Sequence, residues 1–166
     1  SAWWSPVLSI PNDKWQEGGQ MSSPVLIERT LPHSIMVNKA GKRFCNEATN
    51  YSALAGAFHF FDPNQYGYPN LPAWIIFDSN FKDKYPFSTI MPGVDAPNWM
   101  NSADTLNQLA EKLDININNF TETIHNFNNY VDEGNDREFS RGESDYDSFY
   151  GDRSQEGVFS TLGKLN

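Results

Sequence analysis

The sequence predicts an α+β fold built on a mixed or antiparallel sheet, with a hairpin early and two or more helices late. Short extended segments bounded by Pro, Gly and Asn come mostly in the first half of the chain, whereas the clearest helical periodicities lie in the second half. An alternating parallel fold would interleave the two kinds of element. The chain has 166 residues, 39% of them hydrophobic and 14% aromatic, which suits the core of one domain of ordinary size.

The first half predicts extended segments separated by loops. Residues 3–20 are interpreted as a strand followed by the polar loop IPNDKWQEGGQ. Ile35 and Val37 precede the turn sequence NKAGK and Phe44 follows it, which predicts a β-hairpin. Residues 51–61 predict a helix with one apolar face, formed by Leu54, Ala57, Phe58 and Phe61.

The remaining elements follow from apolar runs and spacing. AWIIFD, residues 73–78, predicts a buried strand, and SNFKDKYPF predicts a short helix that ends before Pro86. Ser102 is expected to cap a helix whose apolar side holds Leu106, Leu109, Ala110 and Leu113. A longer helix ending near Gly134 is indicated by spacings of three and four between Ile117, Phe120, Ile124, Phe127 and Val131. The polar and aromatic tail is interpreted as ordered loop.

Charge and cysteine content exclude several classes of partner. A net charge of −9 argues against a nucleic acid and against an anionic membrane surface. No apolar run is long enough for a membrane span. Cys45 is the single cysteine, which excludes an internal disulfide and a cysteine zinc cluster and favours a reducing compartment. We therefore expect a cytoplasmic protein.

The sequence lacks the common cofactor and metal motifs. It contains no GxGxxG, no phosphate-binding loop and no HExxH. The three histidines, His33, His59 and His125, are scattered, so each is expected to be structural. The acidic stretch GESDYDSFYGD does not have the ligand spacing of a calcium loop.

Tyr51 is the one residue singled out for chemistry. It follows Asn46-Glu47 and precedes the small residues SALAGA, which leave space beside its ring. That space fits a flat ligand or a close helix–strand contact, and both interpretations stay open here. Tyrosine acts as a proton acceptor when its pKa is brought toward the working pH.

Four stretches resemble one family. SSPVLIERTLPHSIMVNKAGKRFCNEATNY is similar to the segment ER-x-LPG-x-I-x-VN-x-x-G-x-RF-x-NE-x-x-x-Y of FAD-dependent 3-ketosteroid dehydrogenases, within the wider fumarate reductase and succinate dehydrogenase flavoprotein family. AWWSPVL, PAWIIFDSNFKDKYPF and FSRGESDYDSFYGD resemble three further stretches of that family, in the same order.

The resemblance implies an inserted catalytic domain over the isoalloxazine end of FAD, with the flavin held mainly by flanking Rossmann halves absent from this chain. Residues 3–166 would form that single domain, and Ser1-Ala2 an artificial addition. Tyr51 would take the proton from C2 of a steroid while C1 gives hydride to the flavin. The implied partners are an apolar steroid-like substrate and the flavin domain of the same polypeptide, and the domain alone is expected to be inactive.

Some positions depart from the family pattern and keep alternatives open. His33 stands for the glycine of LPG, and Asn50 for the proline that often precedes the tyrosine. Dehydrogenation at C4–C5, or of a non-steroid cyclic ketone, therefore remains open. A fumarate-reductase-like enzyme would need cationic clamps, for which Arg29 and Arg43 are available. A non-catalytic binding module with an aromatic surface is the alternative of another class.

Three polar residues also have structural interpretations. Asn46 and Glu47 are expected to cap the backbone before the helix. Arg43 is expected to bond local carbonyls or carboxylates.

Overall fold

The computed structural model describes residues 5–14 and 16–166, so Ser1-Ala2 and part of the AWWSPVL stretch lie outside the described residues. The strands are β1 (Val7–Lys14), β2 (Gln20–Pro24), β3 (Ser34–Asn38) and β4 (Ala73–Phe77). The α-helices are α1 (Tyr51–Phe58), α2 (Ser79–Lys84), α3 (Leu106–Leu113), α4 (Ile117–Glu133) and α5 (Asp145–Phe149). Two 3-10 helices complete the set, η1 (Glu28–Thr30) and η2 (Gly157–Ser160). The predicted α+β class is confirmed.

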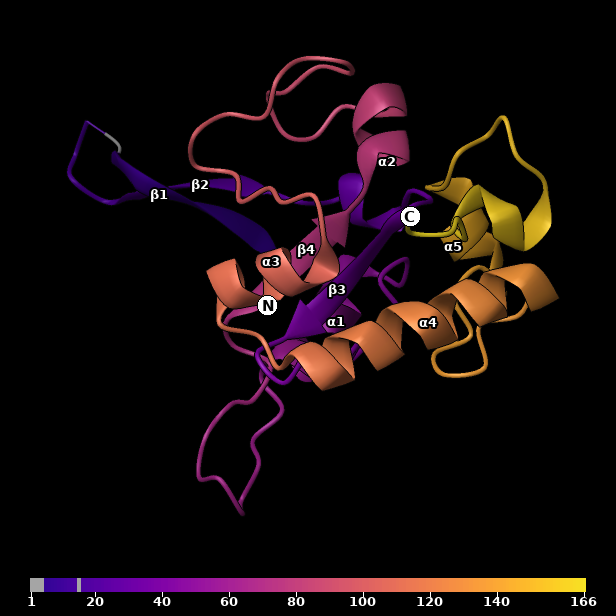
Figure 1. Ribbon diagram of the computed structural model, residues 1–166, viewed down its shortest axis with the longest axis horizontal. Coiled ribbons are helices and arrows are strands. Elements are labelled where there is room, and N and C mark those ends of the chain that lie inside the picture. The colour runs from indigo at the N-terminus through magenta and orange to yellow at the C-terminus, as the bar shows by residue number, and fades with distance from the viewer. Residues whose placement is uncertain (1–4, 15) are drawn as a thin grey trace.

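Both described sheets are antiparallel pairs, β1 with β2 and β3 with β4. The β1–β2 pair extends away from the rest of the molecule, whereas β3–β4 lies in its centre (Figure 1). An early hairpin therefore forms, but not across NKAGK as predicted. Asn38 and Lys42 make a turn, with Asn38 N donating to Lys42 O at 3.0 Å. The chain then leaves the sheet, because the side chain of Arg43 enters a buried ion network, and β4 becomes the partner of β3.

Helices pack on both faces of the β3–β4 pair, so that β3 is fully buried and β4 is half-buried apart from its buried Ile76. Ile35, Val37 and Ile76 pack with α3 and α4, while Met36 packs with Leu54 of α1 on the other face. All five residues of β3 are buried. This explains the continuous apolar run of β4, since a strand covered on both faces does not alternate with polar residues.

The two late helices form as predicted, apart from one cap. The predicted stripe of α4 is confirmed, with four buried side chains at Phe120, Ile124, Phe127 and Val131 and with Gly134 as C-cap at φ 65°. Helix α3 buries Ala110 and Leu113. Its cap is Thr105 and not Ser102, because Thr105 Oγ1 accepts from Gln108 N at 3.3 Å.

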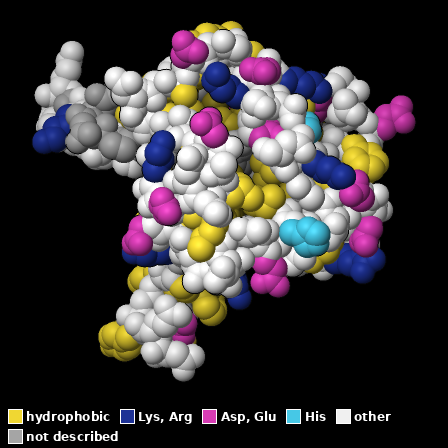
Figure 2. Space-filling view, in the orientation of Figure 1, with side chains coloured by type: hydrophobic (Ala, Val, Ile, Leu, Met, Phe, Trp, Pro, Cys, Tyr) yellow, Lys and Arg dark blue, Asp and Glu magenta, His cyan; other side chains and the backbone are white. Residues whose placement is uncertain are grey.

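Two further expectations need correction. Helix α1 ends at Phe58, and Phe61 lies 41% exposed on the following loop. That loop, between α1 and β4, extends from the bottom of the molecule and carries hydrophobic side chains (Figures 1 and 2). The tail, expected to be loop, contains the short helices α5 and η2.

His33 occupies a backbone conformation that favours glycine. Its φ is 64°, and its Nδ1 donates to Lys164 O at 2.7 Å. The left-handed region costs a residue with a Cβ roughly 1–2 kcal/mol. The Gly of the resembling family's LPG would avoid this cost.

We expect His33→Gly to be more stable than His33→Ala by about 0.5–1 kcal/mol in the free energy of unfolding. Both variants lose the imidazole, but only alanine keeps a Cβ at positive φ. Glycine also increases the conformational entropy of the unfolded chain, which offsets part of its advantage in the folded state. Urea unfolding of the two variants checks this, and an alanine variant of equal or greater stability would contradict it.

Candidate active site

Tyr51 lies at the first position of α1, half-buried. Asn50 is the N-cap, and its Oδ1 accepts from Ser52 N at 2.8 Å. The departure from the family's proline is thus locally satisfied, because asparagine is among the best N-cap residues. Tyr51 is held where the backbone changes from loop to helix.

Arg29 hydrogen-bonds the backbone of the loop before Tyr51. The Nη1 of this arginine donates to Thr49 O at 2.8 Å and also to Glu47 O. Within the loop, Asn46 Oδ1 accepts from Ala48 N at 2.8 Å. Asn46 thus caps a backbone N–H group in the turn before the helix, whereas the N-cap of α1 itself is Asn50.

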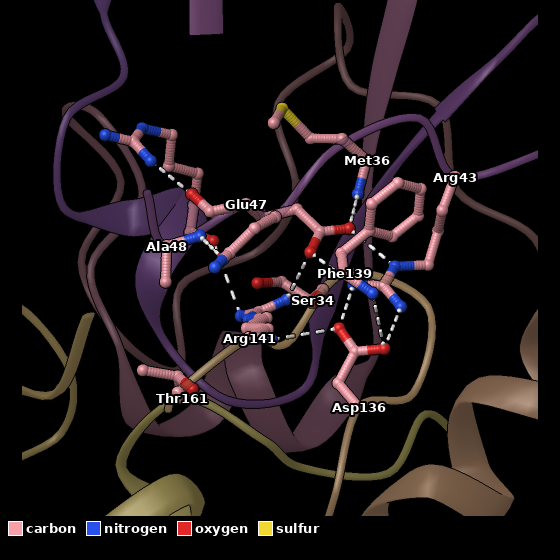
Figure 3. Close-up of polar contacts among 12 residues, drawn as sticks. Ser34, Met36, Arg43, Glu47, Ala48, Asp136, Phe139, Arg141 and Thr161 are labelled. Atoms are coloured by element: carbon pink, nitrogen blue, oxygen red, sulfur yellow. Dashed lines mark hydrogen bonds and ion pairs between the residues drawn. The ribbon is translucent and has the colours of Figure 1, made fainter. Parts of the chain in front are cut away.

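Glu47 is the centre of a fully buried ion network (Figure 3). Its carboxylate accepts from Arg43 at 2.9 and 2.8 Å and from Arg141 Nη1 at 3.2 Å. It also accepts from Met36 N of β3 at 3.1 Å. The prediction that Glu47 caps the helix is wrong, because its side chain turns toward β3 and the two arginines.

Arg43 joins two carboxylates, as its structural interpretation predicted. Besides Glu47, it donates to Asp136 at 3.0 and 2.8 Å (Figure 3). Asp136 follows α4 and lies 93 positions away along the chain. The Arg43 guanidinium also lies 4.9 Å from the Phe127 ring centroid and 5.0 Å from that of Phe139. The network thus connects α4 and the following loop to the segment that leads to Tyr51.

Electrostatics keep the network charged. Burial raises the pKa of Glu47, but the charges of Arg43 and Arg141 and the hydrogen bonds outweigh burial, so the pKa lies below its ordinary value. The pKa of Asp136 is also lowered, since the hydrogen bonds and charge of Arg43 exceed the effect of burial. These pKa shifts stabilise the ionised carboxylates in the folded chain.

Helix α5 lies beside the same segment, which periodicity alone did not show. Asn46 Nδ2 donates to Asp147 Oδ2 at 2.8 Å, and Gly142 N donates to the same oxygen at 3.0 Å. The rings of Tyr146 and Tyr150 lie 5.0 Å apart. Burial raises the pKa of Tyr146, and the neighbouring tyrosines, Tyr150 and Tyr51, raise it further.

The candidate cationic clamps face inward. Arg29 is 2% exposed and Arg43 is 4% exposed, and both hydrogen-bond to the protein interior. A bidentate clamp on a dicarboxylate needs free guanidinium N–H groups at the substrate. The geometry therefore does not favour either arginine as such a clamp.

The histidines do not come together. His33 bonds Lys164 O, His59 Nδ1 bonds Ala55 O at 3.0 Å, and His125 Nε2 lies 3.2 Å from Asn129 Nδ2. Across residues 5–14 and 16–166, no three His, Cys, Asp or Glu side chains are grouped to hold a metal ion. In the same residues, no helix has the length and apolarity needed to cross a bilayer.

Comparison with known proteins extends the resemblance. The chain is 41% identical over 162 residues to the 3-oxosteroid 1-dehydrogenase of Mycolicibacterium smegmatis, covering 91% of this chain and 26% of that protein. It is 34% identical to the 4-oxocyclohexanecarboxylate 2-dehydrogenase of Sinomonas cyclohexanicum, covering 99% of this chain and 28% of that protein. No protein-family model matches the chain.

A solved structure shares the fold. The 3-ketosteroid delta1-dehydrogenase of Sterolibacterium denitrificans, in complex with 1,4-androstadiene-3,17-dione, superposes with a TM-score of 0.83 at 31% identity and covers 99% of this chain and 29% of its own. The chain thus spans about a quarter of the length of the curated relatives it matches. By sequence and by fold, the chain is therefore similar to one part of the 3-ketosteroid dehydrogenases.

Proposed function

We propose that residues 3–166 form the catalytic domain of a flavin-dependent 3-ketosteroid 1-dehydrogenase. The observation that carries this proposal is the match over 99% of the chain to a solved ketosteroid dehydrogenase bound to a steroid dienone. Tyr51 supports it further, because it stands at the start of α1, half-buried and next to small residues. A tyrosine side chain, which has no positive charge to pair with a carboxylate, suits an apolar ketone better than it suits a dicarboxylate.

FAD is proposed as the cofactor, bound by the remainder of the enzyme. This chain contains no glycine-rich phosphate-binding sequence, and its two most buried arginines, Arg29 and Arg141, are turned to backbone carbonyls of the interior. These residues do not fit the diphosphate of FAD. The flavin domain is thus the proposed partner of this one, and the domain alone is expected to be inactive. The buried thiol of Cys45 suits a reducing, cytoplasmic location.

The proposed role of Tyr51 is to accept a proton. Oxidation of a saturated ring at C1–C2 breaks two C–H bonds and forms one C=C bond. In the proposed step the ionised oxygen of Tyr51 takes the proton from C2 and becomes a hydroxyl, and the hydrogen on C1 leaves with its electron pair to the hydride acceptor that FAD would supply when bound. General-base assistance of this kind contributes typically 10²–10⁴-fold to the rate.

A non-steroid cyclic ketone is the second candidate substrate. It is favoured by the 34% identity to a 4-oxocyclohexanecarboxylate dehydrogenase. Dehydrogenation at C4–C5 of a ketosteroid would use the same class of site. The fumarate-reductase alternative is weakened by the buried Arg29 and Arg43. A non-catalytic binding module would bind its partner through exposed aromatic rings. The loop after α1 carries such rings at Phe60, Phe61, Tyr66 and Tyr68.

The substrate assignment is tested with the complete flavoprotein. We expect it to reduce a dye with a ring-A-saturated 3-ketosteroid as electron donor, and to yield the 1,2-unsaturated ketone by mass spectrometry and NMR. 4-Oxocyclohexanecarboxylate and fumarate with a reduced dye serve as comparisons. Turnover of either of these in preference to the steroid would replace the proposal by the corresponding alternative.

A further inference from the structure

Arg29 differs from the other buried arginines in how its charge is compensated. Arg43 and Arg141 form ion pairs with Glu47, and Arg43 also pairs with Asp136. In the part of the chain that the structure describes, Arg29 has no carboxylate within salt-bridge distance. Its Nε, like that of Arg141, has no hydrogen-bond partner among these residues. Arg29 is nevertheless only 2% exposed.

Such a cation is costly to keep. Removing an unpaired charge from water carries an effective penalty of several kcal/mol, and a buried charge is normally paired. If the side chain served packing alone, an apolar residue of similar volume would do so without this penalty. The cost suggests that the charge itself has a use.

The surroundings of Arg29 indicate that use. Its Nη1 bonds the carbonyls of Glu47 and Thr49, and Thr49 lies two positions before Tyr51. Burial lowers the pKa of Arg29 to about 10, and the interaction that opposes burial most strongly is that with Tyr146. In return, the charge of Arg29 acts to lower the pKa of Tyr146, against burial and the charge of Tyr150.

We propose that Arg29 is a positioning residue of the active site. Its two hydrogen bonds hold the backbone that leads into Tyr51. This role rests on the proposed function, because it concerns proton transfer to Tyr51.

The positioning role is tested in the complete flavoprotein with Arg29→Lys, Arg29→Met and, as control, Arg153→Met. Arg153 is an exposed arginine stacked on Phe149 at 4.9 Å, so its loss removes a charge from the same region without touching the loop. We expect kcat per bound flavin to fall by up to roughly 10²-fold in Arg29→Met, because small misplacements of a reacting group have effects of this size. KM should stay within about twofold because the groups that bind substrate are unchanged.

A readout specific to proton transfer separates positioning from general damage. With a substrate deuterated at C2, the kinetic isotope effect on flavin reduction should increase in both Arg29 variants, and Arg29→Lys should retain more activity because it keeps the charge. Unchanged kcat and isotope effect in either folded variant would overturn the positioning role. If Arg29→Met does not fold, Arg29→Lys decides the matter by the same criteria.

Failure of the positioning role can be told apart from failure of the proposed function. A wild-type enzyme that oxidises neither ketosteroids nor cyclic ketones contradicts the proposed function. Wild-type turnover of a ketosteroid, with unchanged kcat and isotope effect in folded Arg29→Lys and Arg29→Met, contradicts the positioning role alone.

Discussion

In the complete flavoprotein, Tyr51→Phe should lower the rate of ketosteroid oxidation by roughly 10²–10⁴-fold, the range expected for loss of a general base. Phenylalanine keeps the ring at the start of α1, and Asn50 still caps the helix. The substitution therefore removes the hydroxyl without removing the packing. KM and flavin content should change little, since the ring still contributes its apolar surface.

The measurement is single-turnover flavin reduction, with Tyr68→Phe as control. Tyr68 is 49% exposed on the loop after α1, so loss of its hydroxyl should leave the rate unchanged. If Tyr51→Phe reduces its flavin at the wild-type rate, Tyr51 is a packing residue and the base lies elsewhere. A parallel loss in both variants would point to a general effect on folding.

The second large effect is expected for Glu47→Gln. Glutamine removes the counter-charge of Arg141 and one of the carboxylates paired with Arg43, where the side chains of Arg43, Glu47 and Arg141 are all 0% exposed. Removing one partner of a buried ion pair typically costs 3–5 kcal/mol. We therefore expect a loss of about this size in the free energy of unfolding, measured by urea denaturation.

Glu133→Gln is the matched control. Glu133 pairs with Arg137 at 2.9 Å, but both side chains are largely exposed, at 42% and 65%. Exposed pairs contribute about 0–1 kcal/mol. If the two variants lose equal stability, the buried network does not have the role assigned to it.

The network also predicts how stability depends on pH. The pKa of Glu47 and that of Asp136 are lower in the folded chain than in the unfolded chain, where they lie near about 4.3 and 3.9. The stabilisation from ionised carboxylates is therefore complete above these unfolded values and is lost as the pH falls through the folded pKa values. Between pH 7 and acid pH, wild type should lose more stability than Glu47→Gln, in which one of the two groups cannot titrate.

Several elements could be predicted from residue patterns because their causes are local. The stripe of α4 and its Gly134 cap follow from side chains three and four positions apart. The AWIIF strand follows from an apolar run of strand length. The Ser102 cap was wrong because Thr105, three positions later, is an equally suitable cap and lies directly before the helix.

The hairpin across NKAGK was wrong for a non-local reason. A turn does form there, but the residue that should begin the second strand is drawn to Asp136, far along the chain. β3 instead pairs with β4, whose five apolar residues let both faces of the pair be buried. Turn chemistry specifies the turn, while tertiary packing selects the strand partner.

The sequence by itself determined the α+β class, the main helices, the family resemblance and Tyr51 as the candidate base. The helices depend on residue type and spacing within one short segment, whereas the class and the resemblance depend on the order of several such segments. Only the tertiary structure decided that Glu47 and Arg43 belong to a buried network with Asp136 and Arg141, and that Arg29 holds the loop before Tyr51. The physical reason is that a buried charge is stable only beside its partners, and folding brings those partners from segments that no local pattern relates.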